Sequence, residues 1–412
     1  MAAALAGYRQ ALAAPGYRRL FYAALASRTG DTINFAALPL FVFAVTGSAR
    51  DVAATVFADG LGLIAGGVLA QLVVDRWPPR RLLIFIDVAR AAFALVLAAI
   101  LTFPAALLIS FALSIGTASF SPTSASLVPR LVSNDGLPAA NGLQWTAGVM
   151  LQFVAAPLGG LLVTLGEVRL AFLLNALSFL ISAVFLGGLP RMQALGRKPR
   201  SWRPRIPEIL SHAHDAAVIR PLLAVQGLAA LAAGATSALL VVLARTAYGL
   251  NGTGYGLWLA VIAGGAIAGP LLAPLLDRFS ATRVLSGAYA VRGLGDLLLS
   301  LLTNGAGGAL VLGVYGVNTS SGMVAFQTLV QREVPPDLRG RAFAALDLTW
   351  QIGRLLSIAL GGLIVGMIGI RILFGAGGAL LFVAGAIGWL FLPHSGLSYM
   401  QRTSMQGKRK QP

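Results

Sequence analysis

The charged stretch Val74-Asp75-Arg76-Trp77-Pro78-Pro79-Arg80-Arg81 lies between two long apolar runs. A related stretch follows 202 positions later and reads Leu276-Asp277-Arg278-Phe279-Ser280-Ala281-Thr282-Arg283. The same offset carries Arg90 to Arg292, and it carries Gly159-Gly160-Leu161 to Gly361-Gly362-Leu363. Repeated coincidence at one constant offset indicates a duplicated unit of about 200 residues, with both copies running in the same direction.

Composition places the chain in a membrane. Of 412 residues, 57% are hydrophobic, only 11% are charged and 49 are glycine, which is typical of a polytopic membrane protein. A hydrocarbon core about 30 Å thick requires about 20 apolar residues per helix. The sequence predicts twelve such helices, in an all-α membrane protein of two six-helix repeats. They cover residues 20–45, 52–74, 82–101, 105–125, 142–165, 170–189, 222–243, 254–276, 284–302, 309–329, 343–368 and 372–392.

Basic residues predict the orientation of these helices. With the N-terminus inside, cytoplasmic segments hold 23 of the 31 Lys and Arg residues, external loops hold four and the spans hold four. Cytoplasmic loops carry this excess in membrane proteins, so we expect both termini in the cytoplasm. The net charge of +17 then faces the anionic cytoplasmic leaflet, and we expect no nucleic acid as a partner. Residues 1–19 lack an uninterrupted apolar core, which favours a cytoplasmic tail over a cleavable signal.

The predicted domains are an N-terminal half at 1–190, a cytoplasmic linker at 191–220, a C-terminal half at 221–392 and a basic tail at 393–412. Within the linker, residues 207–219 predict a short amphipathic helix on the membrane surface. His212 and His214 lie there and His394 lies in the tail, all outside the spans, so we expect no metal site and no intramembrane hydrolase. The chain has no cysteine and no nucleotide-binding loop. We therefore expect no enzyme activity and no cofactor.

The charged stretch resembles the loop signature of the major facilitator superfamily, and the resemblance extends over essentially the whole chain. It matches the signature Gly-x-x-x-Asp-Arg-x-Gly-Arg-Arg in its charged part, whereas Gln71 replaces the first glycine. The resemblance implies a cytoplasmic latch between the two halves. An anion near the start of the eleventh helix would interact favourably with the positive end of that helix. The alternative is a simple stop between helices. The latch residues are Asp75, Arg76, Arg80, Arg81, Asp277, Arg278 and Arg283.

Two further motifs narrow the resemblance. The fifth predicted helix contains Ala155-Ala156-Pro157-Leu158-Gly159-Gly160, similar to the Gly-Pro-x-x-Gly-Gly signature of proton-coupled drug exporters. Close helix packing alone also accounts for Pro157, Gly159 and Gly160. The segment Ser27-Arg28-Thr29-Gly30-Asp31 resembles the first helix of exporters related to enterobactin and macrolide efflux carriers.

Charged residues inside spans are costly and therefore candidates for function. The pairs Arg28 and Asp31, Asp87 and Arg90, Arg292 and Asp296, and Asp347 and Arg354 each share one face of a predicted helix. We predict that Asp31 exchanges protons during transport, with Asp59 and then Asp347 beside Arg354 as the next candidates. The alternative for Asp31 is a structural pair with Arg28. We expect structural roles for Asp87, Arg90, Arg292 and Asp296, on the peripheral helices of the family fold.

The cavity prediction rests on polar residues at matching positions of the two repeats. Hydroxyl and amide side chains recur on the fourth and tenth helices, which favours a binding site at the midplane between the repeats. Bonding between helices is the alternative role for these groups. The cavity candidates are Phe35, Ser119, Trp145, Ser321, Phe326 and Trp350.

Together these features predict an exporter in the cytoplasmic or inner membrane. It moves a small amphipathic organic compound, such as a drug or siderophore, by alternating access and in exchange for protons. We expect a monomer. The alternatives are an importer or facilitator of the same fold, and a membrane receptor or scaffold that transports nothing.

Overall fold

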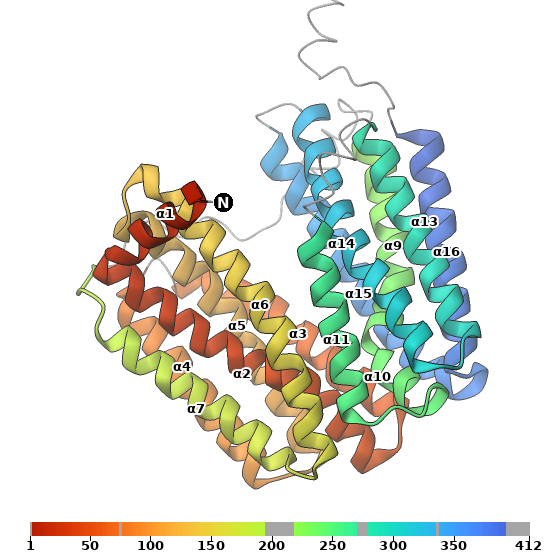
Figure 1. The fold of residues 1–412 in the computed structure, drawn as a ribbon, viewed down its shortest axis with the longest axis horizontal. Helices are drawn as coiled ribbons and strands as arrows, with labels where there is room; N and C mark the ends of the chain where they lie inside the picture. The colour runs from red at the N-terminus through yellow and green to blue at the C-terminus, as the bar shows by residue number, and fades with distance from the viewer. Residues whose placement is uncertain (1, 74–75, 194–217, 270–278, 335–337, 393–412) are drawn as a thin grey trace, which may run out of the picture. The chain divides into compact units, whose positions relative to one another are not determined.

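The computed structural model describes residues 2–73, 76–193, 218–269, 279–334 and 338–392, and every regular element in these ranges is helical. The chain forms two compact units (Figure 1). Unit 1 comprises Met1–Trp202 and Ala244–Ala260, and unit 2 comprises Arg203–Leu243 and Val261–Pro412.

Unit 1 is a bundle of long helices that pack on one another along their lengths. Helix α2 lies against α6 and α7, α3 lies against α5, and α4 lies against both α5 and α7. The short helix α1 packs on α6. The bounds are α1 Ala2–Ala13, α2 Pro15–Thr46, α3 Ala49–Val73, α4 Pro79–Ala99, α5 Phe103–Leu131, a 3-10 turn at Asn134–Gly136, α6 Leu137–Thr164 and α7 Val168–Gly187.

Proline and glycine set the ends of several of these helices. Pro15 and Pro79 occupy first positions of α2 and α4, where the missing N–H group costs no hydrogen bond. Gly47 ends α2 with φ of 62°, and its N–H bonds the carbonyl of Phe43. Glycine tolerates this left-handed conformation, so α2 stops here and α3 begins two residues later.

Unit 2 contains α9 Ile219–Ala238, α10 Leu240–Val242, α13 Ala281–Leu301, α14 Gly305–Glu333, α15 Arg339–Ile368 and α16 Ile370–Phe391. A π-helical turn follows α10 at Leu243–Ala247, and α11, Gly252–Ala268, begins in unit 1 and ends in unit 2. Adding 202 to both bounds of α4 gives the bounds of α13, and the same addition relates α5 to α14. The helix ends thus follow the sequence repeat.

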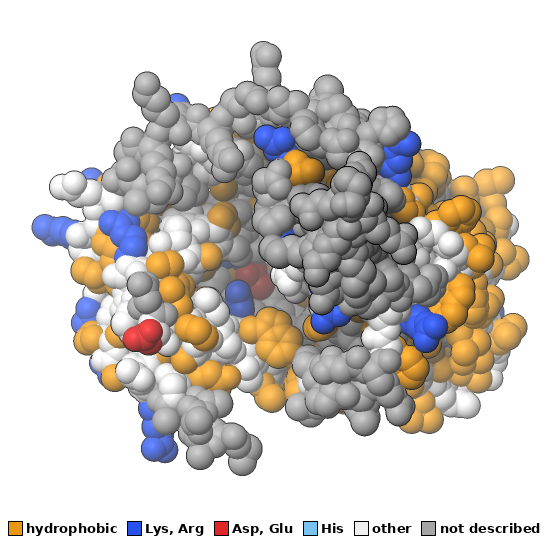
Figure 2. Space-filling view, turned by 90° about the horizontal axis from the view of Figure 1, so that it is seen from above, with side chains coloured by type: hydrophobic (Ala, Val, Ile, Leu, Met, Phe, Trp, Pro, Cys, Tyr) orange, Lys and Arg blue, Asp and Glu red, His pale blue; other side chains and the backbone are white. Residues whose placement is uncertain are grey.

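Eleven helices in the described residues are long and apolar enough to cross a membrane, and α11 is a shorter apolar helix of 17 residues. The predicted span at 254–276 lies partly outside the described residues. Among the described residues, the face seen in Figure 2 shows several basic side chains and few acidic ones, and hydrophobic side chains gather at the right edge of the view. Large apolar side chains such as Val184 and Met367 are highly exposed, as lipid-facing residues are.

Helix α1 was not predicted, because the sequence analysis interpreted residues 1–19 as a tail. Ala11 of this helix is buried in an apolar cluster with Tyr17 and Ala140. The Tyr17 hydroxyl donates a 2.7 Å hydrogen bond to the carbonyl of Ala140 on α6. The alanines of this segment have a high helix propensity, which is a local signal for α1.

Candidate functional site

A buried arginine forms the centre of the charged network in unit 1. Nη2 of Arg90, on α4, lies 2.6 Å from both carboxylate oxygens of Asp31 on α2. Its Nη1 donates to Ser27 Oγ at 2.9 Å and to Asp87 Oδ1 at 3.3 Å, and Nη2 also donates to Thr117 Oγ1 at 2.9 Å. One guanidinium therefore joins side chains from α2, α4 and α5.

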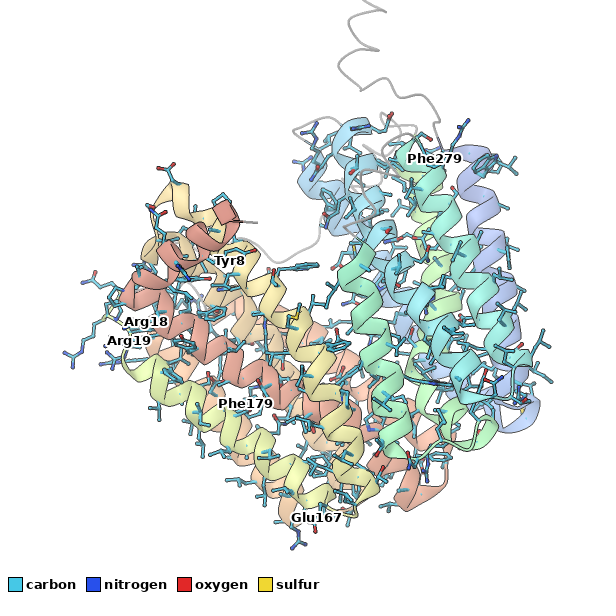
Figure 3. All side chains as sticks on the ribbon, in the orientation of Figure 1. Tyr8, Arg18, Arg19, Glu167, Phe179 and Phe279 are labelled. Atoms are coloured by element: carbon cyan, nitrogen blue, oxygen red, sulfur yellow. The ribbon has the colours of Figure 1, made fainter. Side chains whose placement is uncertain are left out.

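Packing fixes this guanidinium in place. Its central carbon lies 3.9 Å from the ring centroid of Phe179 on α7, a cation–π geometry. Gly116 on α5 leaves room for the arginine stem, because a Cβ there would come within 2.6 Å of Arg90 Cγ and Cδ. Figure 3 shows Arg18 and Arg19 at one end of unit 1 and Glu167 at the opposite end. Phe179 lies between these two ends. The network therefore lies deep between the two ends of the bundle.

The two carboxylates on Arg90 differ in their access to solvent. The Asp31 side chain is 32% exposed, whereas that of Asp87 is fully buried, with Oδ2 lacking a hydrogen-bond partner in the described residues. Asp31 is thus the member of the network that water can reach.

The structure corrects the expected partner of Asp31. The alternative raised from the sequence paired Asp31 with Arg28 on its own helix, but the ion pair forms with Arg90 on α4. Arg28 is exposed and donates from Nη1 to the carbonyl of Gln144 on α6, at 3.3 Å. The spacing of Arg28 and Asp31 was compatible with a pair, but a buried arginine across the helix interface gives Asp31 two short contacts.

Only one of the other expected same-helix pairs forms. Asp87 and Arg90 do pair, as their spacing predicted. In the described residues no ion pair joins Arg292 to Asp296: Asp296 accepts from Thr236 at 3.1 Å, and Arg292 donates to Ser237 and to Tyr315. Arg90 also joins α4 to Asp31 on α2, and its structural role stays a prediction.

The last expected pair is also absent. Asp347 and Arg354 on α15 form no ion pair in the part of the chain that the structure describes, where Asp347 is exposed and Arg354 is half-buried. Two helical turns separate them, which makes contact demanding even for a long arginine side chain.

Asp59 lies on α3 and accepts a hydrogen bond from Ser114 on α5. The contact lies within the closely packed α3 and α5 pair, where Gly62 and Gly66 bring the two backbones together. The role of Asp59 in proton exchange stays a prediction.

The structure describes only some of the latch residues. Asp75, Asp277 and Arg278 lie outside the described residues. Arg76 and Arg81 are exposed and Arg80 is half-buried at the start of α4. In the second copy, Ser280 caps α13 by accepting from the N–H of Arg283, whose guanidinium lies 5.9 Å from the Trp389 ring. The latch remains a prediction.

The glycines of the helix-five motif make close backbone contacts. A Cβ on Gly159 would meet the carbonyl of Ile33 on α2, and one on Gly160 would meet the carbonyl of Gly252 at the start of α11. Next to them, Pro157 lies against Gly256. Thr164 accepts from the N–H of Thr253 at 2.8 Å. Glycine is needed at both motif positions for α6 to approach its neighbours.

The cavity candidates divide into two groups. Ser119 donates to the carbonyl of Gly66 at 3.2 Å, and its repeat equivalent Ser321 donates to Val317 at 3.0 Å and contacts the Gly269 carbonyl at 3.5 Å. These contacts agree with bonding between helices, the alternative role.

The four aromatic candidates also differ from one another. Phe326 packs against Phe343, with ring centroids 6.2 Å apart, and Trp350 packs on an apolar cluster that includes Leu381. Phe35 and Trp145 are each 54% exposed. The role of all four residues in a cavity stays a prediction.

Comparison with known proteins gives one family and many similar folds. A family model described as transmembrane secretion effector, MFS_3, matches residues 3–406. The uncharacterized MFS-type transporter YfiS of Bacillus subtilis (strain 168) is 26% identical over 388 residues, which are 88% of this chain and 91% of that protein.

Among solved structures, the nucleoside transporter NupG has a TM-score of 0.74 at 14% identity, over 91% of this chain and 98% of that one. A bacterial homologue of the iron transporter ferroportin, in an inward-facing state, has a TM-score of 0.71 at 18% identity, over 91% and 98%. At these identities the likeness concerns the fold. The folds compared are those of membrane transporters.

Proposed function

This chain belongs to the MFS_3 family, the transmembrane secretion effectors of the major facilitator superfamily, and we propose that it exports a small amphipathic organic compound in exchange for protons. Export is supported by the description of the family. Antiport is supported by one observation above all: a partly exposed carboxylate, Asp31, held by a buried arginine. The protein acts in the cytoplasmic or inner membrane, with both termini in the cytoplasm.

Asp31 carries the proton in this proposal. Ionised Asp31 makes a charge-assisted contact with Arg90, and protonation removes the negative charge on which this contact depends. Because Arg90 also contacts Asp87, the guanidinium keeps a carboxylate partner when Asp31 becomes neutral. The change at Asp31 loosens α2 from α4 without leaving the buried arginine unpaired. Arg90 is thus a positioning residue, and Asp31 is the group that binds and releases the proton.

The other predicted residues have roles in the proposed alternating-access cycle. Rocking of the N-terminal half against the C-terminal half would expose Asp31 to the two sides in turn, as in other transporters built from parallel repeats. Asp75 and Asp277, with the arginines that follow them, act as the cytoplasmic latch. Asp59 is the second candidate for proton exchange, and Asp347 beside Arg354 is the third.

The test uses everted membrane vesicles loaded with a pH-sensitive dye and acidified by respiration. Addition of an exported compound from a panel of lipophilic drugs and siderophores restores the fluorescence, because its uptake into the vesicles releases protons. We expect recovery with the wild type and with Asp51→Asn, a change in an aspartate outside the network, and no recovery with Asp31→Asn. Recovery that survives Asp31→Asn would move proton coupling to Asp59 or Asp347.

An absence of recovery with every compound would contradict proton-coupled export. Flux of labelled compounds would then separate a facilitator or importer from a receptor or scaffold. The flux measurement tests for import because nucleoside and peptide transporters are among the proteins of similar fold.

A further inference from the structure

One face of α2 carries a second arginine that the Arg90 network does not use. Arg28, Asp31 and Phe35 are spaced three and four residues apart, which places them on the same face of the helix. Arg28 is exposed, Asp31 is 32% exposed and Phe35 is 54% exposed. The open side of α2 therefore combines a cation, a carboxylate and an aromatic ring.

This face belongs to α2, a helix that is long and apolar enough to cross a membrane. Arg28 follows Pro15 by 13 residues, and at about 1.5 Å per residue it lies about 20 Å along an α2 axis of 32 residues. An arginine at this depth rarely faces lipid, because charged side chains inside membranes turn to the bundle interior or to a water-filled cavity. We therefore interpret the face of Arg28, Asp31 and Phe35 as the wall of an aqueous space.

Arg28 has hydrogen-bonding capacity to spare. Its one hydrogen bond within the described residues runs from Nη1 to the Gln144 carbonyl at 3.3 Å, whereas a guanidinium has about five N–H donors. The nearest acid on its own helix is Asp31, and both oxygens of Asp31 are engaged by Arg90. Arg28 is thus a cation within the membrane that forms no ion pair with the described residues.

The neighbouring helix makes room for this guanidinium. A Cβ on Gly148 of α6 would lie 2.8 Å from Arg28 Nη1, so glycine at this position lets the side chain rest against α6. Trp145 precedes Gly148 by three residues, which places the two on one face of α6, and its side chain is 54% exposed. By spacing, α2 thus carries an exposed aromatic side chain on the face of Arg28, and α6 carries one on the face of Gly148.

We propose that Arg28, which rests on Gly148, binds the acidic group of the cargo. The cargo is then an amphipathic organic anion with a carboxylate or similar oxygen acid, and not a lipophilic cation. Arginine matches the planar geometry of a carboxylate with two parallel hydrogen bonds, and the aromatic rings take the apolar body. This inference rests on the proposed export and specifies the chemical class of its substrate.

The test measures binding to the full chain in nanodiscs of zwitterionic lipid, independently of transport. The probe is tritiated 1-naphthaleneacetate, competed by its uncharged amide and by 1-naphthylmethylammonium. We expect the anion to bind best and its affinity to fall about tenfold or more in Arg28→Gln, because a desolvated charge pair is lost. Arg28→Lys should retain part of the affinity, and Gly148→Ala should reduce it by displacing the guanidinium. Arg50→Gln, which changes an exposed residue at the start of α3, should leave the affinity unchanged.

Three results would overturn the proposal. They are equal or tighter binding of the amide or the cation, absence of measurable anion binding, and an Arg28→Gln variant that binds as the wild type does. Nanodiscs that contain phosphatidylglycerol test a lipid phosphate as the occupant: complete displacement of the probe by this lipid would assign the site to lipid.

Vesicle flux of the same three compounds separates this inference from the proposed export. Export of the cation and not of the anion would preserve export and contradict the anion site. Anion binding that depends on Arg28, without flux of any compound, would support the site and contradict export.

Discussion

Nη2 of Arg90 lies 2.6 Å from both carboxylate oxygens of Asp31, although 59 positions separate the two residues in the chain. The contact joins the buried middle of α4 to the partly exposed face of α2. In the coupling proposed above, a proton that binds Asp31 would act on the packing of these two helices. The predictions below test the network, the packing around it and the latch.

Removal of the buried guanidinium should destabilise the protein strongly. Arg90→Gln leaves Asp31 and Asp87 without their shared cation, and breaking a buried pair from one side costs about 3–5 kcal/mol. We expect a large drop in the apparent melting temperature of the detergent-solubilised protein, measured by gel filtration after heating. The variant Arg81→Gln, which changes an exposed arginine of the same helix, should have the melting temperature of the wild type. Equal melting of Arg90→Gln and wild type would show that the network contributes nothing to stability.

Two adjacent glycines of α3 should respond differently to alanine. A Cβ on Gly66 would lie 2.5 Å from the Ile115 carbonyl oxygen and 2.7 Å from its Cα, whereas a Cβ on Gly67 meets no atom within 4 Å. Gly66→Ala forces α3 away from the α5 backbone, at a cost of about 1–3 kcal/mol. Gly67→Ala should be neutral or slightly stabilising, because alanine favours the helix. Comparison of the two melting temperatures checks this, and a neutral Gly66→Ala would contradict the packing of α3 on α5.

The close approach of α6 to the start of α11 should be needed for transport. A Cβ on Gly160 would overlap the Gly252 carbonyl, so Gly160→Ala prevents the two backbones from meeting. We expect several-fold slower flux at unchanged expression, by comparison with Gly187→Ala, where a Cβ meets nothing within 4 Å. Normal flux in Gly160→Ala would show that this contact is not part of the cycle.

The latch is tested by accessibility, and the chain suits this because it contains no cysteine. Single cysteines introduced on the predicted cytoplasmic side serve as reporters for a membrane-impermeant maleimide. If Asp75 holds this side closed, Asp75→Asn should increase their labelling rate and change the transport rate, because the latch loses its anion. Unchanged labelling together with unchanged transport would reduce the charged stretch to a stop between helices.

Much of the fold could be predicted from the sequence. Apolar runs located the long helices, and the repeat offset anticipated that α13 and α14 would reproduce the bounds of α4 and α5. These features are local or periodic and leave a direct record in the chain. Helix α1 was missed because its burial against α6 depends on tertiary packing, which the Ala-rich composition of residues 1–19 does not specify.

The site was harder to predict, for a physical reason. Spacing along one helix identified Asp31 and Arg90 as notable charges and paired Asp87 with Arg90, but it could not reveal which arginine crosses from α4 to α2. A clue was available: Arg90 was the cation of a peripheral helix, and such a charge requires partners from neighbouring helices. In the same way, hydroxyls such as Ser119 signal polarity, but only the structure shows whether they bond across helices.

The most direct test of the account uses proteoliposomes, with a cargo identified by the vesicle screen. Two quantities are compared for wild type and Asp31→Asn: accumulation of labelled cargo driven by an imposed proton gradient, and exchange of cargo without any gradient. The account predicts that Asp31→Asn still exchanges cargo but loses accumulation driven by the gradient, because it has no group to carry the proton. Wild-type accumulation by Asp31→Asn would contradict the account.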